Sequence, residues 1–145
     1  MLPCKLYISP SIEISMNTIE KHILVAKALS DKNRIRALFA LEQGELCACD
    51  IIELLHLVPS TVSKHMGILI KAGLVEGRKD GRWMHYRLSM KNNSGKTRML
   101  FELMREDVQK DVIIREDRKR LRIIIKKCKQ RQCALKTIEK RIRSK

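Results

Sequence analysis

The stretch that decides the fold is PSTVSKHMGILIKAGLVEGRKDGRWMHYRL, residues 59–88. Pro59 suits the first turn of a helix, and apolar residues then recur at three- and four-residue spacing until Gly73, which ends the helix. The Asp80-Gly81 pair is a strong hairpin turn. Strands are expected at 74–79 and 82–88. A helix followed by a hairpin with a basic tip predicts the second half of a winged helix-turn-helix.

Helical periodicity extends on both sides of this stretch. Helices are expected over about 16–29, from Ser30 as N-cap to Gly44, briefly after Cys49, and again after Gly95 through Val108. The predicted fold is therefore mainly α with a small β-hairpin. The last of these helices carries an apolar stripe that either packs on its own core or pairs with the first helix in a two-fold dimer, and the dimer is favoured.

Charge divides the 145-residue chain unevenly. Its 31 Lys and Arg against 16 Asp and Glu give a net charge of +15, which favours a polyanionic partner. Thirteen of those bases and a single acid lie between 118 and 145, so the rest of the chain is nearly neutral. We therefore expect an N-terminal arm at 1–15, a DNA-binding and dimerisation domain at 16–110, and a basic extension at 111–145. The extension, a helix or a partly disordered arm, would strengthen phosphate binding without specifying sequence.

The helix that begins at Pro59 leaves small polar and basic side chains on the face opposite its apolar residues. This composition suits a DNA major groove, while basic residues at the tip of the hairpin would reach phosphate or the minor groove. The predicted DNA-binding residues are Ser60, Thr61, Ser63, Lys64 and His65 on the helix, and Lys79 and Arg82 on the hairpin.

Two thiols precede this DNA-reading element, in Glu45-Leu46-Cys47-Ala48-Cys49-Asp50. The chain has five cysteines, an odd number, with no export signal and no run of about 18 apolar residues. We therefore expect a soluble cytoplasmic protein with reduced thiols and no membrane partner. A position near a helix N-terminus is expected to lower the pKa values of Cys47 and Cys49 and to ready them as ligands.

The assembled segments resemble the ArsR/SmtB family of metal-responsive repressors over about 29–88. The resemblance is carried, in the family's order, by Leu29-Ser30-Asp31, Arg34-Ile35-Arg36-Ala37-Leu38, Glu45 to Asp50, Ser63-Lys64-His65-Met66, Ala72-Gly73-Leu74-Val75 and Gly81 to Leu88. It implies a homodimeric winged-helix repressor that binds operator DNA without metal and is released by its inducer. The implied inducer is a thiophilic ion, with As(III) or Sb(III) favoured and Cd(II) or Pb(II) possible.

The resemblance carries the metal site over to Cys47 and Cys49 alone. A third cysteine often lies three residues beyond the second in the arsenite-sensing branch, but this chain has Ile52 there. The first choice for the missing ligand is Cys4, because an N-terminal arm supplies cysteines in the cadmium- and lead-sensing branch. Cys128 or Cys133 is the alternative, and their spacing places them about 140° apart on a helix. The family's zinc site on the last helix is not expected, since no His follows His85.

Other classes fit the sequence less well. A redox-sensing repressor of the same fold stays open, because oxidation of the thiols would replace metal binding. A thiol oxidoreductase is disfavoured because Cys-x-Cys is not the Cys-x-x-Cys redox pattern. A general nucleic-acid compacting protein is the remaining alternative, suggested by the basic extension, and it would bind DNA without regard to sequence. With no phosphate-binding glycine loop and no catalytic motif, neither an enzyme nor an organic cofactor is expected.

Overall fold

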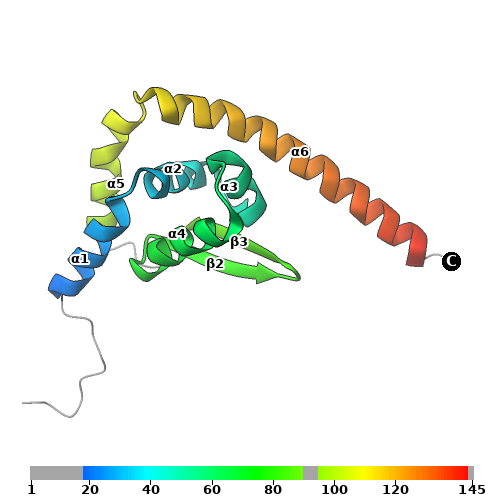
Figure 1. Cartoon of the computed structure of the whole chain (residues 1–145), viewed down its shortest axis with the longest axis horizontal. Coiled ribbons are helices and arrows are strands. Elements are labelled where there is room, and N and C mark those ends of the chain that lie inside the picture. Colours follow the sequence, from blue (N-terminus) through cyan, green and yellow to red (C-terminus); the bar gives the residue numbers. More distant parts are fainter. Residues whose placement is uncertain (1–17, 90–94, 144–145) are drawn as a thin grey trace, which may run out of the picture.

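A computed structural model describes residues 18–89 and 95–143, with the side chains of 95–98, 100 and 131–141 left out of the description. Its elements in chain order are α1 (Thr18–Leu29), α2 (Lys32–Ala40), a 3₁₀ turn η1 (Leu41–Gln43), β1 (Leu46–Cys47), α3 (Ala48–Leu55), α4 (Pro59–Lys71), β2 (Val75–Asp80), β3 (Trp83–Leu88), α5 (Gly95–Val108) and α6 (Val112–Arg143). Figure 1 shows α2, α3 and α4 packed together above the β2–β3 hairpin, with α6 crossing over them. The mainly helical fold with a small hairpin is confirmed.

The core is aliphatic and is formed where α2, α3 and α4 meet the hairpin. Ile51 and Leu54 of α3 and Met66 and Leu69 of α4 belong to this core, and all four side chains are fully buried. Burying one such side chain contributes about 1.5–3 kcal/mol. Because α3 and α4 share this close-packed core, a displacement of α3 is transmitted to α4.

A third strand, absent from the sequence prediction, joins the hairpin. The strand order is β1-β3-β2 and both pairings are antiparallel, with Leu46 opposite Tyr86 and Cys47 opposite His85. β1 has only two residues, too few for an alternating pattern to be recognised. It places Cys47 beside the central strand of the wing.

The N-cap of α2 is Asp31, and the expectation of Ser30 is wrong. The Asp31 carboxylate accepts the backbone N–H groups of Asn33 at 2.9 Å and Arg34 at 3.0 Å. The Ser30 hydroxyl instead donates to the Lys27 carbonyl at 2.7 Å, at the end of α1. Both residue types cap helices well, so the sequence alone could not separate neighbours.

Asp31 should also contribute a pH-dependent part of stability. Burial opposes its ionised form, but the N–H groups of Arg34 and Asn33 and the charges of Arg34 and His65 outweigh this, and the pKa of Asp31 is lowered from 3.8. A carboxyl with a lowered folded-state pKa stabilises above its unfolded pKa, and the stabilisation is lost as the pH falls through the folded value. We expect Asp31→Asn to keep the cap yet flatten acid unfolding below about pH 4, whereas Asp31→Ala should cost about 1 kcal/mol near neutral pH. Urea titrations at several pH values test this, and an unchanged acid slope in Asp31→Asn would contradict it.

The basic extension forms one helix of 32 residues, α6, which lies against α2 and α3. Its residues Ile114, Leu121 and Ile124 are buried. Asp117 is also buried and accepts two hydrogen bonds from the Arg36 guanidinium, at 2.7 and 2.8 Å. The first half of α6 is therefore held on the body by an apolar stripe and one buried ion pair.

Helix α5 is held to α2 by stacked rings of Phe39 and Phe101, whose centroids lie 4.8 Å apart. An ion pair between Arg105 and Glu42, at 3.1 Å, adds a second link to the turn after α2. Within the described ranges, each helix is too short or too polar to cross a lipid bilayer.

Candidate metal centre and nucleic-acid interface

The N-terminus of α3 is capped by a thiol. Cys47 is both the last residue of β1 and the N-cap of α3, and its side chain accepts the backbone N–H of Asp50. The Asp50 carboxylate in return accepts the Cys47 N–H at 3.0 Å, which completes a capping box. Both side chains are buried, with 5% of Cys47 and 7% of Asp50 exposed. The Cys47 thiol thus lies where β1, which pairs with the wing strand β3, meets α3 of the helix-turn-helix.

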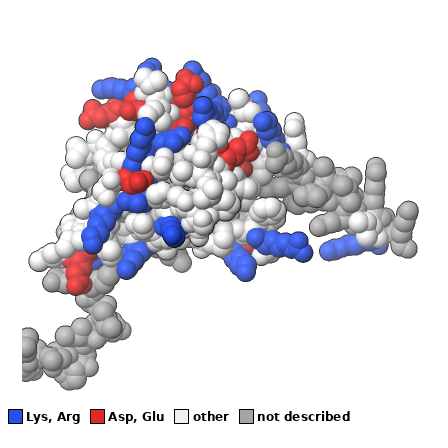
Figure 2. All heavy atoms as spheres, in the orientation of Figure 1, with Lys and Arg blue, Asp and Glu red and all other residues white. Residues whose placement is uncertain are grey.

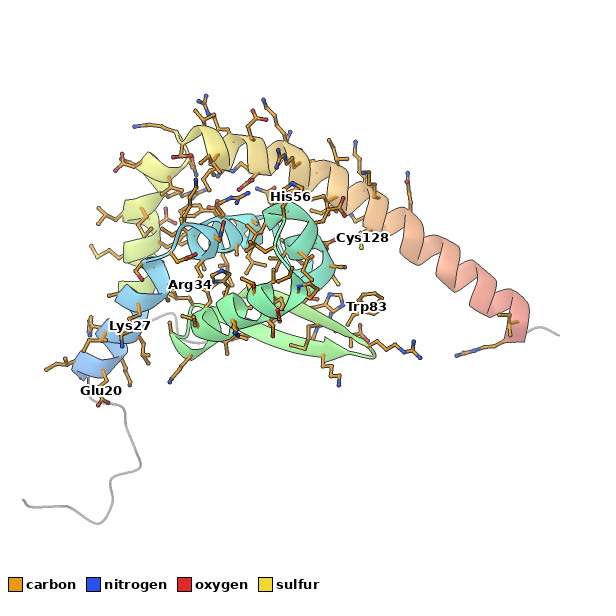
Figure 3. The ribbon with its side chains drawn as sticks, in the orientation of Figure 1. Glu20, Lys27, Arg34, His56, Trp83 and Cys128 are labelled. Atoms are coloured by element: carbon orange, nitrogen blue, oxygen red, sulfur yellow. The ribbon has the colours of Figure 1, made fainter. Side chains whose placement is uncertain are left out.

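A third cysteine reaches this joint from the other end of the sequence. The Sγ atoms of Cys49 and Cys128 and a carboxylate oxygen of Asp50 all lie within 4.8 Å of one another. Cys49 also shares a hydrogen bond with Cys47, and Cys128 hydrogen-bonds with Asp50 and Cys49. Figure 3 shows Cys128 on the side of α6 that faces α3. Three thiols and one carboxylate therefore gather where α6 passes the start of α3.

The expectation that the helix N-terminus lowers thiol pKa values is wrong for Cys49. Burial raises its pKa, and so do its hydrogen bond with Cys47 and the negative charges of Cys47 and Asp50. The pKa of Cys128 is raised for the same reasons, burial first and then the charge of Asp50. Desolvation and like charges outweigh the helix dipole here. These effects favour the protonated form of both thiols, so binding of a sulfur-preferring ion would release protons.

The donor set fits a soft ion. Cys47, Cys49 and Cys128 form no disulfide, so each offers a sulfur ligand. Thiolates select thiophilic ions such as Cd(II) over hard cations, which prefer oxygen donors. A divalent or trivalent cation would also neutralise the negative charge that thiolates and Asp50 would otherwise concentrate in a half-buried site.

The predicted ligands fall into three groups. Cys47 and Cys49 are adjacent at the start of α3, and Cys128 joins them. Cys4 and the side chain of Cys133 lie outside the described residues. Ile52, at the position of the absent third cysteine, packs against the core from α3. Sequence reasoning missed Asp50 as a neighbour of the thiols, although the three-residue spacing from Cys47 to an acidic residue is the spacing of a capping box.

The predicted DNA-binding residues divide by exposure. Those on α4 and the wing that stand in solvent are Ser60, Ser63, Lys64, Lys79 and Arg82. Thr61 and His65 are half-buried. Figure 2 shows Lys and Arg prevailing along the lower edge of the molecule, where α4 and the hairpin lie in Figure 1, whereas Asp and Glu gather mainly toward the top. The exposed face of α4 and the wing thus carries groups suited to phosphate and base edges.

His65 has protein neighbours as well. Its Nδ1 lies 3.4 Å from the Arg34 guanidinium and 4.0 Å from the Asp31 carboxylate, and 13% of its side chain is exposed. These contacts link α4 to the start of α2. A DNA contact by His65 stays a prediction.

Apolar side chains are exposed at the end of the molecule where α1 and α5 lie (Figure 1). Ile23 of α1 is 46% exposed, and Met99 and Leu103 of α5 are each 74% exposed. Large apolar groups exposed in this way indicate a surface that is covered in an assembly.

Comparison with known proteins identifies this arrangement. The family described as bacterial regulatory protein, arsR family, matches residues 31–77. The arsenical resistance operon repressor of Escherichia coli K12 is 41% identical over 68 residues, which cover 46% of this chain and 58% of the repressor. The cadmium resistance transcriptional regulatory protein CadC of Listeria innocua is 41% identical over 61 residues, 41% of this chain and 51% of that protein. The matches thus span little more than half the length of these relatives.

A solved structure supports the same assignment. A possible transcriptional regulatory protein from Mycobacterium bovis, residues 1–100, superposes with a TM-score of 0.54 at 27% identity, covering 63% of this chain and 95% of that one. All three proteins are named as regulators, in agreement with the prediction that the chain is not an enzyme. The matched residues run from the cap of α2 through the thiols and α4 into β2. The arsenical resistance operon repressor of Bacillus subtilis 168 is matched over 80% of its length, at 30% identity over 84 residues that cover 57% of this chain, and the chain therefore belongs to the ArsR family of bacterial regulatory proteins.

Proposed function

We propose that this chain is a transcriptional repressor that binds operator DNA as a homodimer and is released when a thiophilic ion binds at Cys47 and Cys49. The observation that carries the proposal is the position of Cys47, which ends β1 and caps α3. β1 pairs with the wing strand β3, and α3 packs on α4. An ion at this joint therefore acts on both elements that would touch DNA.

Ion binding is coupled to DNA binding because the ion competes with the Asp50 N–H for the Cys47 thiol. An ion that draws the thiol out of its cap would leave the Asp50 N–H without the acceptor that it has in this structure. Loss of an N-cap costs a helix about 0.5–2 kcal/mol. Because α3 shares a close-packed core with α4, a shift of its first turn moves the recognition helix relative to the wing. A coupling of about 1–3 kcal/mol would weaken operator binding by about 5–150-fold.

The homodimer is supported by the exposed apolar side chains of α1 and α5. Ile23, Met99 and Leu103 would be covered by the same surface of a second copy, as a two-fold interface requires. Two copies related by a two-fold axis would place two α4 helices in successive major grooves of a symmetric operator.

Trivalent arsenic or antimony is the first candidate inducer, since the thiols Cys47 and Cys49 need only one further sulfur for three-coordinate chemistry. Cd(II) is the second candidate, because the Asp50 carboxylate lies beside Cys49 and would add an oxygen to a higher-coordinate site. Relatives named for arsenical and for cadmium resistance support both. The raised pKa values of Cys49 and Cys128 disfavour a redox sensor, which depends on accessible thiolate.

DNA recognition is tested by selecting duplexes from a random-sequence pool with the full chain. We expect enrichment of a two-fold symmetric sequence bound by two chains. Replacing Ser63 and Lys64, both exposed on α4, by Ala should lower the preference for the selected duplex over unrelated DNA by at least about 10-fold, or about 1.4 kcal/mol. Gel-shift titrations against both duplexes measure this ratio.

The matched control is Lys79→Ala on the wing, exposed like Lys64 but expected to contact phosphate. It should weaken binding to both duplexes alike and reduce the slope of log affinity against log salt by about 1. Failure of the pool to enrich any sequence would contradict a repressor and favour a general nucleic-acid compacting protein.

A further inference from the structure

We infer that Cys128 supplies the third sulfur of the inducer site, so that the site closes within one chain and the bound ion ties α6 to the start of α3. This inference rests on the proposed function for its biological meaning, but it concerns a ligand set that can be measured without DNA. It replaces the absent cysteine at Ile52 with one 79 residues beyond Cys49.

The helical repeat of α6 places Cys128 on its packed face. The buried residues Ile114, Asp117, Leu121 and Ile124 recur at intervals of three and four. Cys128 follows Ile124 by four residues and Leu121 by seven, so it lies about 20° around the helix from Leu121. Its half-buried thiol therefore continues the stripe that holds α6 on the body.

The sulfur atoms of Cys49 and Cys128 are already close to the separation that a shared ion requires. Two sulfurs bound to one ion at about 2.3 Å lie about 3.5–4.0 Å apart. The Cys49 and Cys128 sulfurs are already within 4.8 Å, and Cys47 shares a hydrogen bond with Cys49. A change of side-chain rotamer at Cys47, which would release its cap on α3, is the rearrangement that the three-sulfur site requires.

The body fixes α6 before the ion arrives. The Arg36 guanidinium binds Asp117, 11 residues before Cys128, and also donates to the Leu54 carbonyl of α3 at 3.4 Å. On the exposed side, the Arg120 guanidinium lies 3.2 Å from His56 at the end of α3. Because these contacts hold the C-terminal end of α3 against α6, the ion meets a preorganised pair of helices rather than a segment that must be ordered on binding.

Arsenite fits the three-sulfur set without a change of oxidation state. Each thiol gives up its proton as a sulfur–arsenic bond forms, and each departing hydroxide of arsenious acid takes up one proton. The products are the tris-thiolate complex and three molecules of water.

The test is arsenic X-ray absorption on the full chain loaded with sodium arsenite, together with titrations of arsenite and of phenylarsine oxide, which binds only two thiols. We expect three sulfurs around arsenic in the parent and two in Cys128→Ser, with arsenite affinity lowered at least about 10-fold. Phenylarsine oxide should bind both proteins equally, which shows that Cys47 and Cys49 remain intact in the variant. Cys133→Ser, on the same helix but about 140° away, is the matched control and should keep three sulfurs.

A mixed dimer tests closure within one chain. Chains carrying Cys47→Ser with Cys49→Ser, mixed with Cys128→Ser chains, should form no three-sulfur site. Three sulfurs around arsenic in the mixture would overturn the inference and assign the third ligand to the other chain. Three sulfurs in Cys128→Ser, together with only two in Cys4→Ser, would also overturn it and assign the third ligand to Cys4. Three sulfurs that include Cys128, without release of DNA by arsenite, would support the inference and refute the proposed function instead.

Discussion

Replacing Cys47 and Cys49 by Ser should abolish the response to arsenite while leaving operator binding unchanged. In the parent, arsenite is expected to weaken operator binding by about 5–150-fold. In the double variant the ratio should be close to one, because hydroxyl groups do not replace thiolates as ligands for soft ions. The measurement is operator affinity by fluorescence anisotropy with and without arsenite.

Serine at position 47 should remove the sulfur ligand without disturbing the start of α3. The Cys47 side chain acts as N-cap by accepting the Asp50 N–H, and serine is among the best N-cap residues. The capping box with Asp50 should therefore survive, along with β1 and the start of α3. A double variant that is still released from DNA by arsenite would place the inducer site elsewhere.

Replacing Asp117 by Asn should strongly destabilise the fold, lowering the free energy of unfolding by about 3–5 kcal/mol. Asp117 and Arg36 form a nearly buried pair, with 7% and 14% of their side chains exposed, and hydrogen bonding to Asp117 raises the pKa of Arg36. Asparagine keeps the size but leaves the guanidinium charge uncompensated against α2 and α3. Urea unfolding at a fixed chain concentration measures the loss.

The neighbouring acid provides the control. Glu116 pairs with Lys119 at 2.9 Å on the exposed side of the same helix, so Glu116→Gln should leave stability unchanged within error. Amide exchange adds a local readout, because Asp117→Asn should raise exchange in the first half of α6 more than in α4. Equal stability of the two variants would show that the buried pair does not hold α6 to the body.

Local patterns predicted the elements nearest the DNA surface. The period of apolar residues from Val62 to Ile70 and the Asp80-Gly81 turn are contained within short windows, and the structure has α4 and the hairpin where they indicate. The two-residue β1 was missed because its identity depends on pairing with β3, not on its own composition. The cap of α2 was displaced by one residue because Ser30 and Asp31 are equally suited to capping.

The sequence by itself determined the helix-turn-helix with its wing and the two thiols before it, because each of these features depends only on residues that are close together in the sequence. Only the tertiary structure decided what surrounds those thiols. It brought Cys128 to Cys49 and Asp50 across 79 positions, and it raised the pKa of Cys49, which the helix dipole alone would lower. The physical reason is that periodicity shows which face of α6 is apolar but not which surface it meets. That choice was made by burial of Leu121 and Ile124 and by the pairing of Asp117 with Arg36.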